Sequence, residues 1–121
     1  IEKANDLSNF GKTLEIKSDA IPIGDIETLN ENYDFIVNAS SLGLNNESNI
    51  IPTKLIDSNT TVYDIVYKPV NTALIKDSKK KNAEIIYGYE MLLSQAVRSF
   101  EIWLGQKAPY EAMKKAILGG F

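Results

Sequence analysis

The chain has 121 residues, of which 44% are hydrophobic and 24% charged, and its formal net charge is −3. This length and composition are typical of one soluble globular domain with its own core. Phosphate binding depends on clustered lysine and arginine, so the acidic balance predicts no nucleic-acid partner. The one biased tract, Lys79–Lys81, is best interpreted as the solvated end of a helix.

The sequence contains no cysteine and no histidine. Disulfides, thiolate or imidazole metal sites and histidine-activated nucleophiles are therefore excluded within this chain. Because no dense aspartate cluster is present either, we expect no metal site. No apolar run reaches the roughly 18 residues of a membrane span, and no signal-peptide pattern opens the chain, which predicts a cytoplasmic protein without membrane contact.

The first third of the sequence predicts three short elements. Residues 1–12 repeat apolar side chains at helical spacing, with Gly11 as a natural end of the helix. That helix has no N-cap residue before it, so we expect the chain to be part of a longer one. Residues 13–16 (Thr-Leu-Glu-Ile) predict a short strand, and residues 25–30 a short helix capped by Asp25.

Three stretches in the middle of the chain, residues 34–40, 61–67 and 83–88, are rich in β-branched and aromatic residues. Such nearly continuous apolar runs are typical of parallel strands covered on both faces. Residues 71–82, between the second and third run, have apolar residues early and lysines late, which predicts a crossover helix. The alternation predicts an α/β fold with right-handed connections.

The last third of the sequence predicts two helices. The longest helical pattern covers residues 89–105 and ends at Gly105. Its apolar side chains recur every three or four residues, and we expect them, Trp103 included, to pack in a core. Pro109 opens a final helix predicted over residues 109–120.

Polar or small residues follow each predicted strand. In an open parallel sheet, ligands bind at the carboxyl ends of the strands, so these residues would gather at one ligand-facing edge. Tyr67 follows the second strand, and Gly88 follows the third, where it opens a helix that carries Met91 and Gln95. The first strand is followed by Asn38, Ala39, Ser40 and Ser41.

Each of these residues also has a purely structural interpretation. Asn38 and the serines could cap the connection that follows the strand, because such side chains often satisfy turn backbone. Tyr67 could be an ordinary aromatic residue at a strand end. Gln95 lies among apolar neighbours in the sequence, and a backbone carbonyl could satisfy its amide as well as a ligand could.

Three segments in this order carry a resemblance to a known family: "DFIVNASSLGL", "VYDIVYKPVNTALI" and "YGYEMLLSQAVRSFEIWLG". Over residues 34–110 the chain resembles the C-terminal cofactor-binding half of shikimate dehydrogenase. The resemblance implies a partial Rossmann-like, doubly wound parallel sheet, truncated at its N-terminal end. It also implies an NADP-dependent oxidoreductase that reduces 3-dehydroshikimate to shikimate with NADPH in aromatic amino-acid biosynthesis.

The resemblance also implies roles for individual residues. Tyr67 and Gln95 would bind hydroxyl or carboxylate groups of the substrate. No catalytic residue is expected in this chain, because the family's catalytic Lys and Asp and its Gly-rich phosphate loop would precede Ile1. The chain alone would therefore be inactive. The residues expected to contact the cofactor are Asn38, Ala39, Ser40, Ser41, Ile65, Gly88 and Met91.

The same family pattern predicts an open sheet edge. In the strand order 3-2-1-4-5-6, residues 13–16 would be the third strand, and the three apolar runs the fourth to sixth. The strands between them would be missing, so residues 34–40 would form an unpaired edge that invites self-association with a second copy.

Three alternatives remain open at this stage. A quinate/shikimate dehydrogenase would use the same edge with a different cofactor or substrate preference. A non-catalytic Rossmann-like interaction domain would keep the fold alone. A methyltransferase is the weakest alternative, because "DIVYKP" lacks the two prolines before an aromatic residue that its motif requires.

Overall fold

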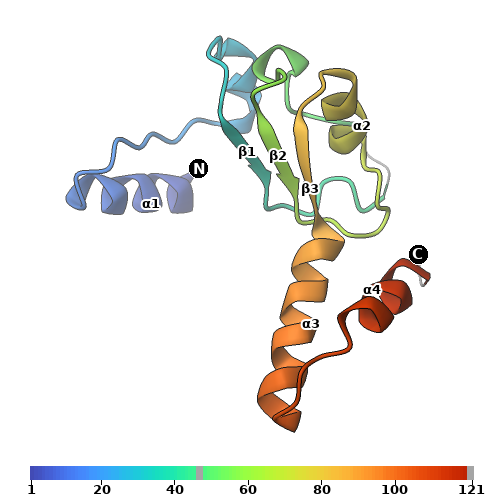
Figure 1. Ribbon diagram of the computed structural model, residues 1–121. Helices are drawn as coiled ribbons and strands as arrows, with labels where there is room; N and C mark the ends of the chain where they lie inside the picture. Colours follow the sequence, from blue (N-terminus) through green and yellow to red (C-terminus); the bar gives the residue numbers. More distant parts are fainter. Residues whose placement is uncertain (46–47, 120–121) are drawn as a thin grey trace. The chain divides into compact units, whose positions relative to one another are not determined.

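The computed structural model describes residues 1–45 and 48–119, which divide into two compact units, Ile1–Glu31 and Asn32–Phe121. The first unit contains helix α1 (Glu2–Thr13) and the 3₁₀ helix η1 (Ile23–Thr28) (Figure 1). In place of the helix predicted over residues 25–30, the chain forms the tighter turn of η1. None of the helices described is long and apolar enough to cross a membrane.

We expected Gly11 to end the first helix, but it does not. Instead, it allows a close approach of the chain that follows. Helix α1 continues past it, and a Cβ atom at position 11 would lie 2.7 Å from Ser18 Oγ. Ser8 and Ser18 exchange two hydrogen bonds of 2.8 Å, each hydroxyl donating to the other residue's carbonyl oxygen. The glycine therefore makes room for this pair.

The prediction of a strand over residues 13–16 is wrong. Thr13 is the last residue of α1, and the amides of Leu14 and Ile16 both donate to the carbonyl oxygen of Gly11, at 3.0 Å. Glu15 has a φ of 59°, which turns the chain sharply. Four residues without a neighbouring strand cannot satisfy their backbone in a ladder, so these amides find acceptors in the preceding helix turn instead.

The second unit contains the predicted parallel sheet, in the order β1 (Phe35–Asn38), β2 (Thr61–Asp64), β3 (Glu84–Tyr87). The parallel arrangement is confirmed. All three strands are shorter than predicted. β2 ends at Asp64 rather than Tyr67 because the Asp64 carboxylate accepts a hydrogen bond of 3.1 Å from the Val66 amide, which takes that amide out of the ladder.

Helix α2 (Ala73–Lys80) is the predicted crossover between β2 and β3. It covers one face of the sheet, where Leu74 packs with Val62 and with Ile56, which follows the 3₁₀ helix η2 (Thr53–Leu55). Lys79, Lys80 and Lys81 at its end are exposed, as expected of the lysine tract, and Lys80 pairs with Asp77 at 2.8 Å.

The face of the sheet opposite α2 is open along β1 within the described residues of this unit, which contradicts the expectation of two covered faces. Phe35 and Val37 of β1 are 51% and 47% exposed, whereas Ile36 between them packs against the core. Side chains alternate along a strand, so these two residues belong to the face opposite α2. Among the residues that the structure describes, β1 has β2 as a neighbour on one side only, so the predicted open edge is present.

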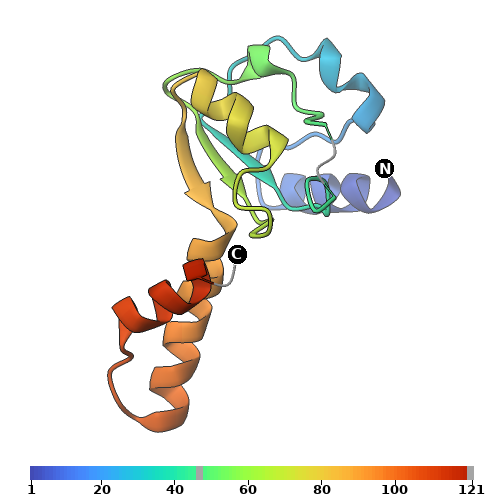
Figure 2. The same cartoon turned by 90° about the vertical axis from the view of Figure 1, so that its right-hand side faces the viewer.

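Helix α3 (Gly88–Leu104) extends away from the sheet, and α4 (Tyr110–Gly119) folds back beside it (Figures 1 and 2). Gly105 ends α3 in the left-handed conformation, with a φ of 61°, as predicted. Trp103 does not pack in a core as expected, because it is 78% exposed. Helix α4 is the element next to Trp103. Met113 is the residue of α4 that lines the same groove as Trp103.

Helix α3 begins immediately after β3, and the junction lies against the backbone of β2. A Cβ atom at Gly88 would lie 2.5 Å from the carbonyl oxygen of Ile65 and 2.8 Å from that of Asp64. Real Cβ atoms do not come so close to backbone atoms, so this position accepts only glycine without a shift of the strands.

We therefore expect Gly88→Ala to lower the free energy of unfolding by about 2 kcal/mol, the usual cost of forcing an extra carbon into a packed site. Urea unfolding followed by circular dichroism measures the change. Gly24→Ala is the matched control, because no atom lies within 4 Å of the added Cβ there. Equal stabilities of the two variants would contradict the close approach at Gly88.

Candidate functional site at the carboxyl edge of the sheet

The three strands end level with one another at one edge of the sheet. Asn38, Asp64 and Tyr87 are register partners across the three strands and are the last residues of each. The backbone also continues the pairing past the strands, since the Ile65 amide donates to the carbonyl oxygen of Asn38 at 3.1 Å. The polar segments that follow the strands therefore start from one line, as predicted.

The segment after β1 is organised by the side chain of Asn38. Its Oδ1 accepts hydrogen bonds from the Ser40 hydroxyl at 2.6 Å and from the Ser40 amide at 3.2 Å. Its Nδ2 donates to the carbonyl oxygen of Leu42 at 2.9 Å. The structural interpretation of Asn38 and Ser40 therefore has direct support. Ala39, Ser40 and Ser41 are all exposed, and of these three small residues Ser40 is the one whose hydroxyl is bound to Asn38.

A buried carboxylate lies next to this segment. Asp64 is 1% exposed, and its Oδ1 accepts hydrogen bonds from Asn38 Nδ2 at 2.9 Å and from the Val66 amide at 3.1 Å. Its Oδ2 accepts from the Thr72 hydroxyl at 2.6 Å. A charge taken out of water requires such donors, and here they come from the segments after β1 and β2 and from the start of α2.

Tyr67 lies in the connection between β2 and α2 and is 42% exposed. The next peptide bond, Lys68–Pro69, is cis. The residues from Lys68 to Asn71 line a hollow of about 700 Å³ together with Lys76 of α2 and Leu118 of α4. Tyr67 itself is not one of the lining residues of this hollow.

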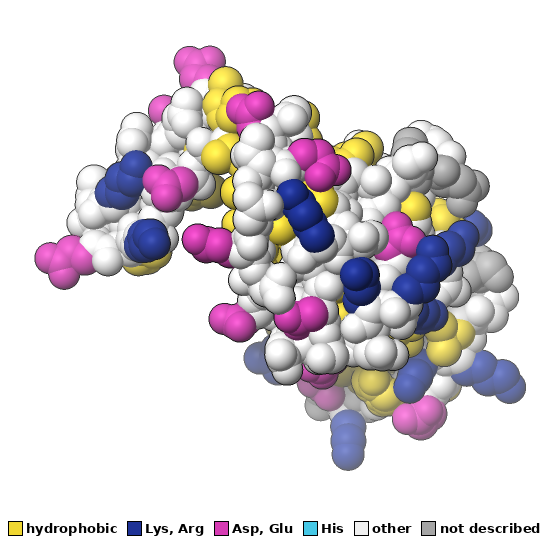
Figure 3. All heavy atoms as spheres, turned by 90° about the horizontal axis from the view of Figure 1, so that it is seen from above, with side chains coloured by type: hydrophobic (Ala, Val, Ile, Leu, Met, Phe, Trp, Pro, Cys, Tyr) yellow, Lys and Arg dark blue, Asp and Glu magenta, His cyan; other side chains and the backbone are white. Residues whose placement is uncertain are grey.

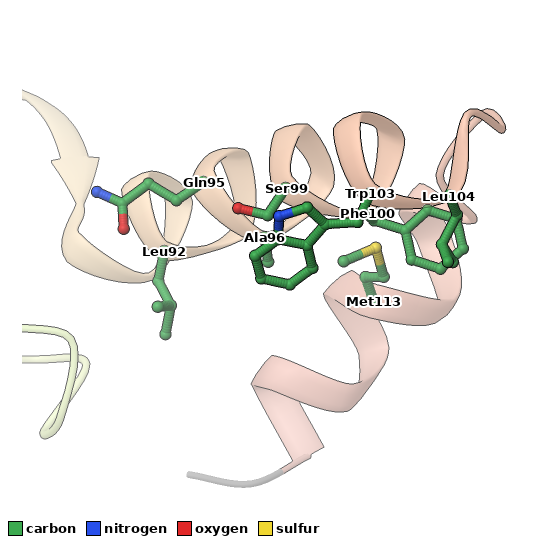
Figure 4. Close-up of a pocket in the computed structure, with 8 residues that line it drawn as sticks. All are labelled: Leu92, Gln95, Ala96, Ser99, Phe100, Trp103, Leu104 and Met113. Carbon is green, nitrogen blue, oxygen red and sulfur yellow. The ribbon is translucent and has the colours of Figure 1, made fainter.

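Met91 and Gln95 lie on successive turns of α3. Gln95 is exposed and lines a groove of about 530 Å³ between α3 and α4. Figure 4 shows its amide at the end of this groove nearest the sheet, with Leu92 beside it and with Trp103 and Met113 further along. The other lining residues are Ala96, Ser99, Phe100 and Leu104. The groove itself is therefore apolar, and Gln95 marks its polar end.

The structure thus brings some predicted site residues together directly and others only onto the same side of the sheet. Asn38 and Ser40 share hydrogen bonds, and Ile65 lies against Gly88. Neither Ser41 nor Tyr67 is among the residues that line the groove beside Gln95. A single hollow shared by Ser41, Tyr67 and Gln95 therefore stays a prediction.

Two aromatic rings flank the start of α3. The rings of Tyr87 and Tyr89 stack with centroids 5.4 Å apart, and Lys79 Nζ lies 5.5 Å from the centre of the Tyr87 ring. Burial raises the pKa of the Tyr89 phenol, and the carboxylate of Glu90 raises it further. Tyr89 therefore stays a neutral phenol at physiological pH.

Charged groups of both signs occur on the face seen in Figure 3, and neither sign covers it. Among residues 1–45 and 48–119, no group of three or more acidic side chains is placed to hold a metal ion.

The sequence reasoning missed Asp64 and Thr72 as members of this site. Both are almost completely buried and hydrogen bonded to each other. A signal was present in the sequence, because an aspartate inside the apolar run "TVYDIVY" has to find donors once that run is buried. Thr72 precedes the apolar start of the crossover helix, where an N-cap threonine is expected.

Comparisons with known proteins agree with this arrangement. The family model of the shikimate 5'-dehydrogenase C-terminal domain matches residues 88–118. The shikimate dehydrogenase (NADP(+)) of Nitrosopumilus maritimus is 55% identical over 121 residues, which are 100% of this chain and 44% of that protein. The chain therefore spans less than half the length of this relative.

Solved structures show the same fold. A shikimate dehydrogenase in complex with NADP+ matches with a TM-score of 0.78 and 29% identity, over 99% of this chain and 44% of the other. A quinate dehydrogenase from Corynebacterium glutamicum in complex with NAD has a TM-score of 0.79 but only 21% identity, over 98% and 43% of the two chains. The latter likeness supports the fold alone. The predicted Rossmann-like α/β architecture is confirmed.

We expect Asp64→Asn to lower the free energy of unfolding by about 2 kcal/mol, because an amide cannot accept all three hydrogen bonds and leaves one buried donor without a partner. Chemical unfolding monitored by tryptophan fluorescence and circular dichroism measures the change. Asp34→Asn, at an exposed position just before β1, is the control and should stay within about 0.5 kcal/mol of the unchanged chain. If the free energy of unfolding changes equally little in both variants, the three hydrogen bonds of Asp64 do not stabilise the edge as described.

Proposed function

Because the chain belongs to the shikimate dehydrogenase family, as the C-terminal region of its members, we propose that it forms the cofactor side of the active site in an NADP-dependent shikimate dehydrogenase. The reaction is the reversible reduction of 3-dehydroshikimate to shikimate with NADPH. The observation that carries this proposal is the 55% identity to a shikimate dehydrogenase (NADP(+)) along the whole chain, all three strand-end segments included.

The carboxyl edge of the sheet fits the nicotinamide half of the cofactor. Ala39 and Ser41 are small and exposed, so a flat ring can approach the backbone that follows β1. Ile65 is partly buried against Gly88, and Met91 follows on the first turn of α3. NADPH supplies the hydride when it is bound; the residues of this chain bind and orient its nicotinamide.

The phosphates of the cofactor would be held elsewhere. Rossmann-like proteins bind the pyrophosphate at a glycine-rich turn before a helix, and this sequence contains no Gly-x-Gly segment. We therefore expect residues 1–121 to contribute only part of the binding energy for NADP+ and to show no activity by themselves.

Tyr67 and Gln95 are the residues that we propose to contact the substrate. Tyr67 is 42% exposed in the connection that follows β2, and the amide of the exposed Gln95 lies at the end of the α3–α4 groove nearest the sheet (Figure 4). Both groups donate and accept hydrogen bonds, which suits a ring that carries hydroxyl groups and a carboxylate. Neither group is placed to transfer the hydride, so their role is to hold the substrate.

The test uses an assembled enzyme, defined as residues 1–121 joined to the preceding region of the Nitrosopumilus maritimus relative. We expect this enzyme to oxidise shikimate with NADP+, measured by absorbance at the wavelength specific to NADPH, whereas residues 1–121 alone show no turnover. In the assembled enzyme, Tyr67→Phe should raise the KM for shikimate about fivefold, because one hydrogen bond contributes about 1 kcal/mol.

Tyr110→Phe is the matched control, because this exposed tyrosine opens α4, away from the strand ends, and should leave the KM unchanged. Parallel assays with quinate and with NAD+ separate the quinate/shikimate alternative from the proposal. A folded assembled enzyme that binds neither NADP+ nor shikimate would refute the proposed function and favour a non-catalytic domain.

We also propose that residues 1–121 self-associate through the open edge of β1. The edge has no strand partner within the described residues, and Phe35 and Val37 next to it are exposed. Unpaired strand edges with apolar side chains are templates for pairing. Light scattering after size-exclusion chromatography should show a concentration-dependent dimer that Val37→Lys weakens. A monomer at all concentrations, for both proteins, would exclude this association.

A further inference from the structure

Thr72 lies at the meeting point of three segments and is only 2% exposed. Its hydroxyl oxygen accepts a hydrogen bond of 3.3 Å from the Ile75 amide, which caps α2. The same hydroxyl donates to Asp64 Oδ2 at 2.6 Å. Because the oxygen is already an acceptor for α2, its single proton is directed to Asp64. Thr72 thus ties the position of α2 to the carboxylate at the end of β2.

Asp64 connects Thr72 to the segments at the ends of β1 and β2. Its second carboxylate oxygen accepts hydrogen bonds from Asn38 Nδ2 and from the Val66 amide. Asn38 in turn holds Ser40, so a continuous series of hydrogen bonds runs from α2 to the segment after β1. A movement of Asp64 would therefore shift both segments together.

The methyl group of Thr72 acts on the same segment from a second side. Gly43 is buried and has a φ of +103°, and a Cβ atom there would lie 3.0 Å from Thr72 Cγ2. The methyl group therefore packs directly against the Gly43 backbone, where residues 39–43 end. Thr72 fixes one end of this segment through Asn38 and the other end by packing.

We propose that Thr72 is a positioning residue for the cofactor, which fixes, through Asp64 and Gly43, the two segments that receive the nicotinamide. The inference rests on the proposed function. Thr72 itself touches neither cofactor nor substrate. Its effect is geometric, because a binding site has to hold its contacting groups within about 0.5 Å of the productive geometry, and a displacement of both segments would weaken the binding of the nicotinamide.

The hydroxyl and the methyl group can be tested separately in the assembled enzyme. Thr72→Val keeps the shape of the side chain and removes the donor to Asp64. Thr72→Ser keeps the donor and removes the methyl group. The matched control is Thr60→Val, because Thr60 is also buried and its hydroxyl accepts a hydrogen bond of 3.1 Å from the Asp57 amide. Thr60 directly precedes β2, so it lies at the opposite edge of the sheet.

We expect Thr72→Val to raise the KM for NADP+ about tenfold at a temperature at which the enzyme is fully folded. Thr72→Ser should stay within about threefold of the unchanged enzyme, because it keeps the hydrogen bond and loses only packing. Thr60→Val should lower the unfolding midpoint to a similar extent as Thr72→Val and leave the KM unchanged. If both valine variants only lower the midpoint, Thr72 is merely structural and the inference is overturned.

Hydrogen exchange provides a second readout that does not depend on turnover. In Thr72→Val the Val66 amide, which donates to Asp64, should exchange faster than in the unchanged enzyme, whereas in Thr60→Val it should not. Should Thr72→Val fail to fold, Asn38→Ala removes the other end of the same series of bonds and should raise the KM for NADP+; an unchanged KM would overturn the inference. If the assembled enzyme without any substitution shows no activity, the proposed function is refuted, and this inference with it.

Discussion

The carboxylate of Asp64 is the constraint on which the candidate site depends. It is almost completely buried, and an ionised group in that position is tolerated only if donors surround it. Each of its donors belongs to a different segment: Asn38 at the end of β1, Val66 after β2 and Thr72 before α2. The need to satisfy one charge therefore decides where three connections lie, and the outward-facing residues of those connections form the edge.

This constraint also explains why residue type alone is a poor guide to ligand contacts at this edge. Asn38 and Ser40 have polar side chains of the kind that bind cofactors. Their hydrogen bonds are made within the connection itself, to each other and to Leu42. Their neighbours Ala39 and Ser41 are both small and exposed. The first pair sets the shape of the segment, and the second pair is what a bound ring would meet.

Much of the second unit could be predicted from the sequence because its signals are local and consistent. Gly105 after a long helical pattern and the three apolar runs each have a single sensible interpretation. The predictions over residues 13–16 and for Trp103 depended instead on neighbours, since a strand requires a partner and a core aromatic requires a covering element. Where the described residues offer neither, residues 13–16 turn back on α1 and Trp103 stays exposed.

The direct passage from β3 into α3 has a mechanical consequence. Tyr87 ends the strand and Gly88 starts the helix, with the Gly88 backbone pressed against Ile65. A junction with no connecting residues and a close backbone contact cannot serve as a hinge, so α3 keeps a fixed direction relative to the sheet. Gln95 therefore stays about 10 Å along the helix axis from Gly88. Any change in the position of Gln95 relative to the sheet must therefore come from bending elsewhere in the chain and not at this junction.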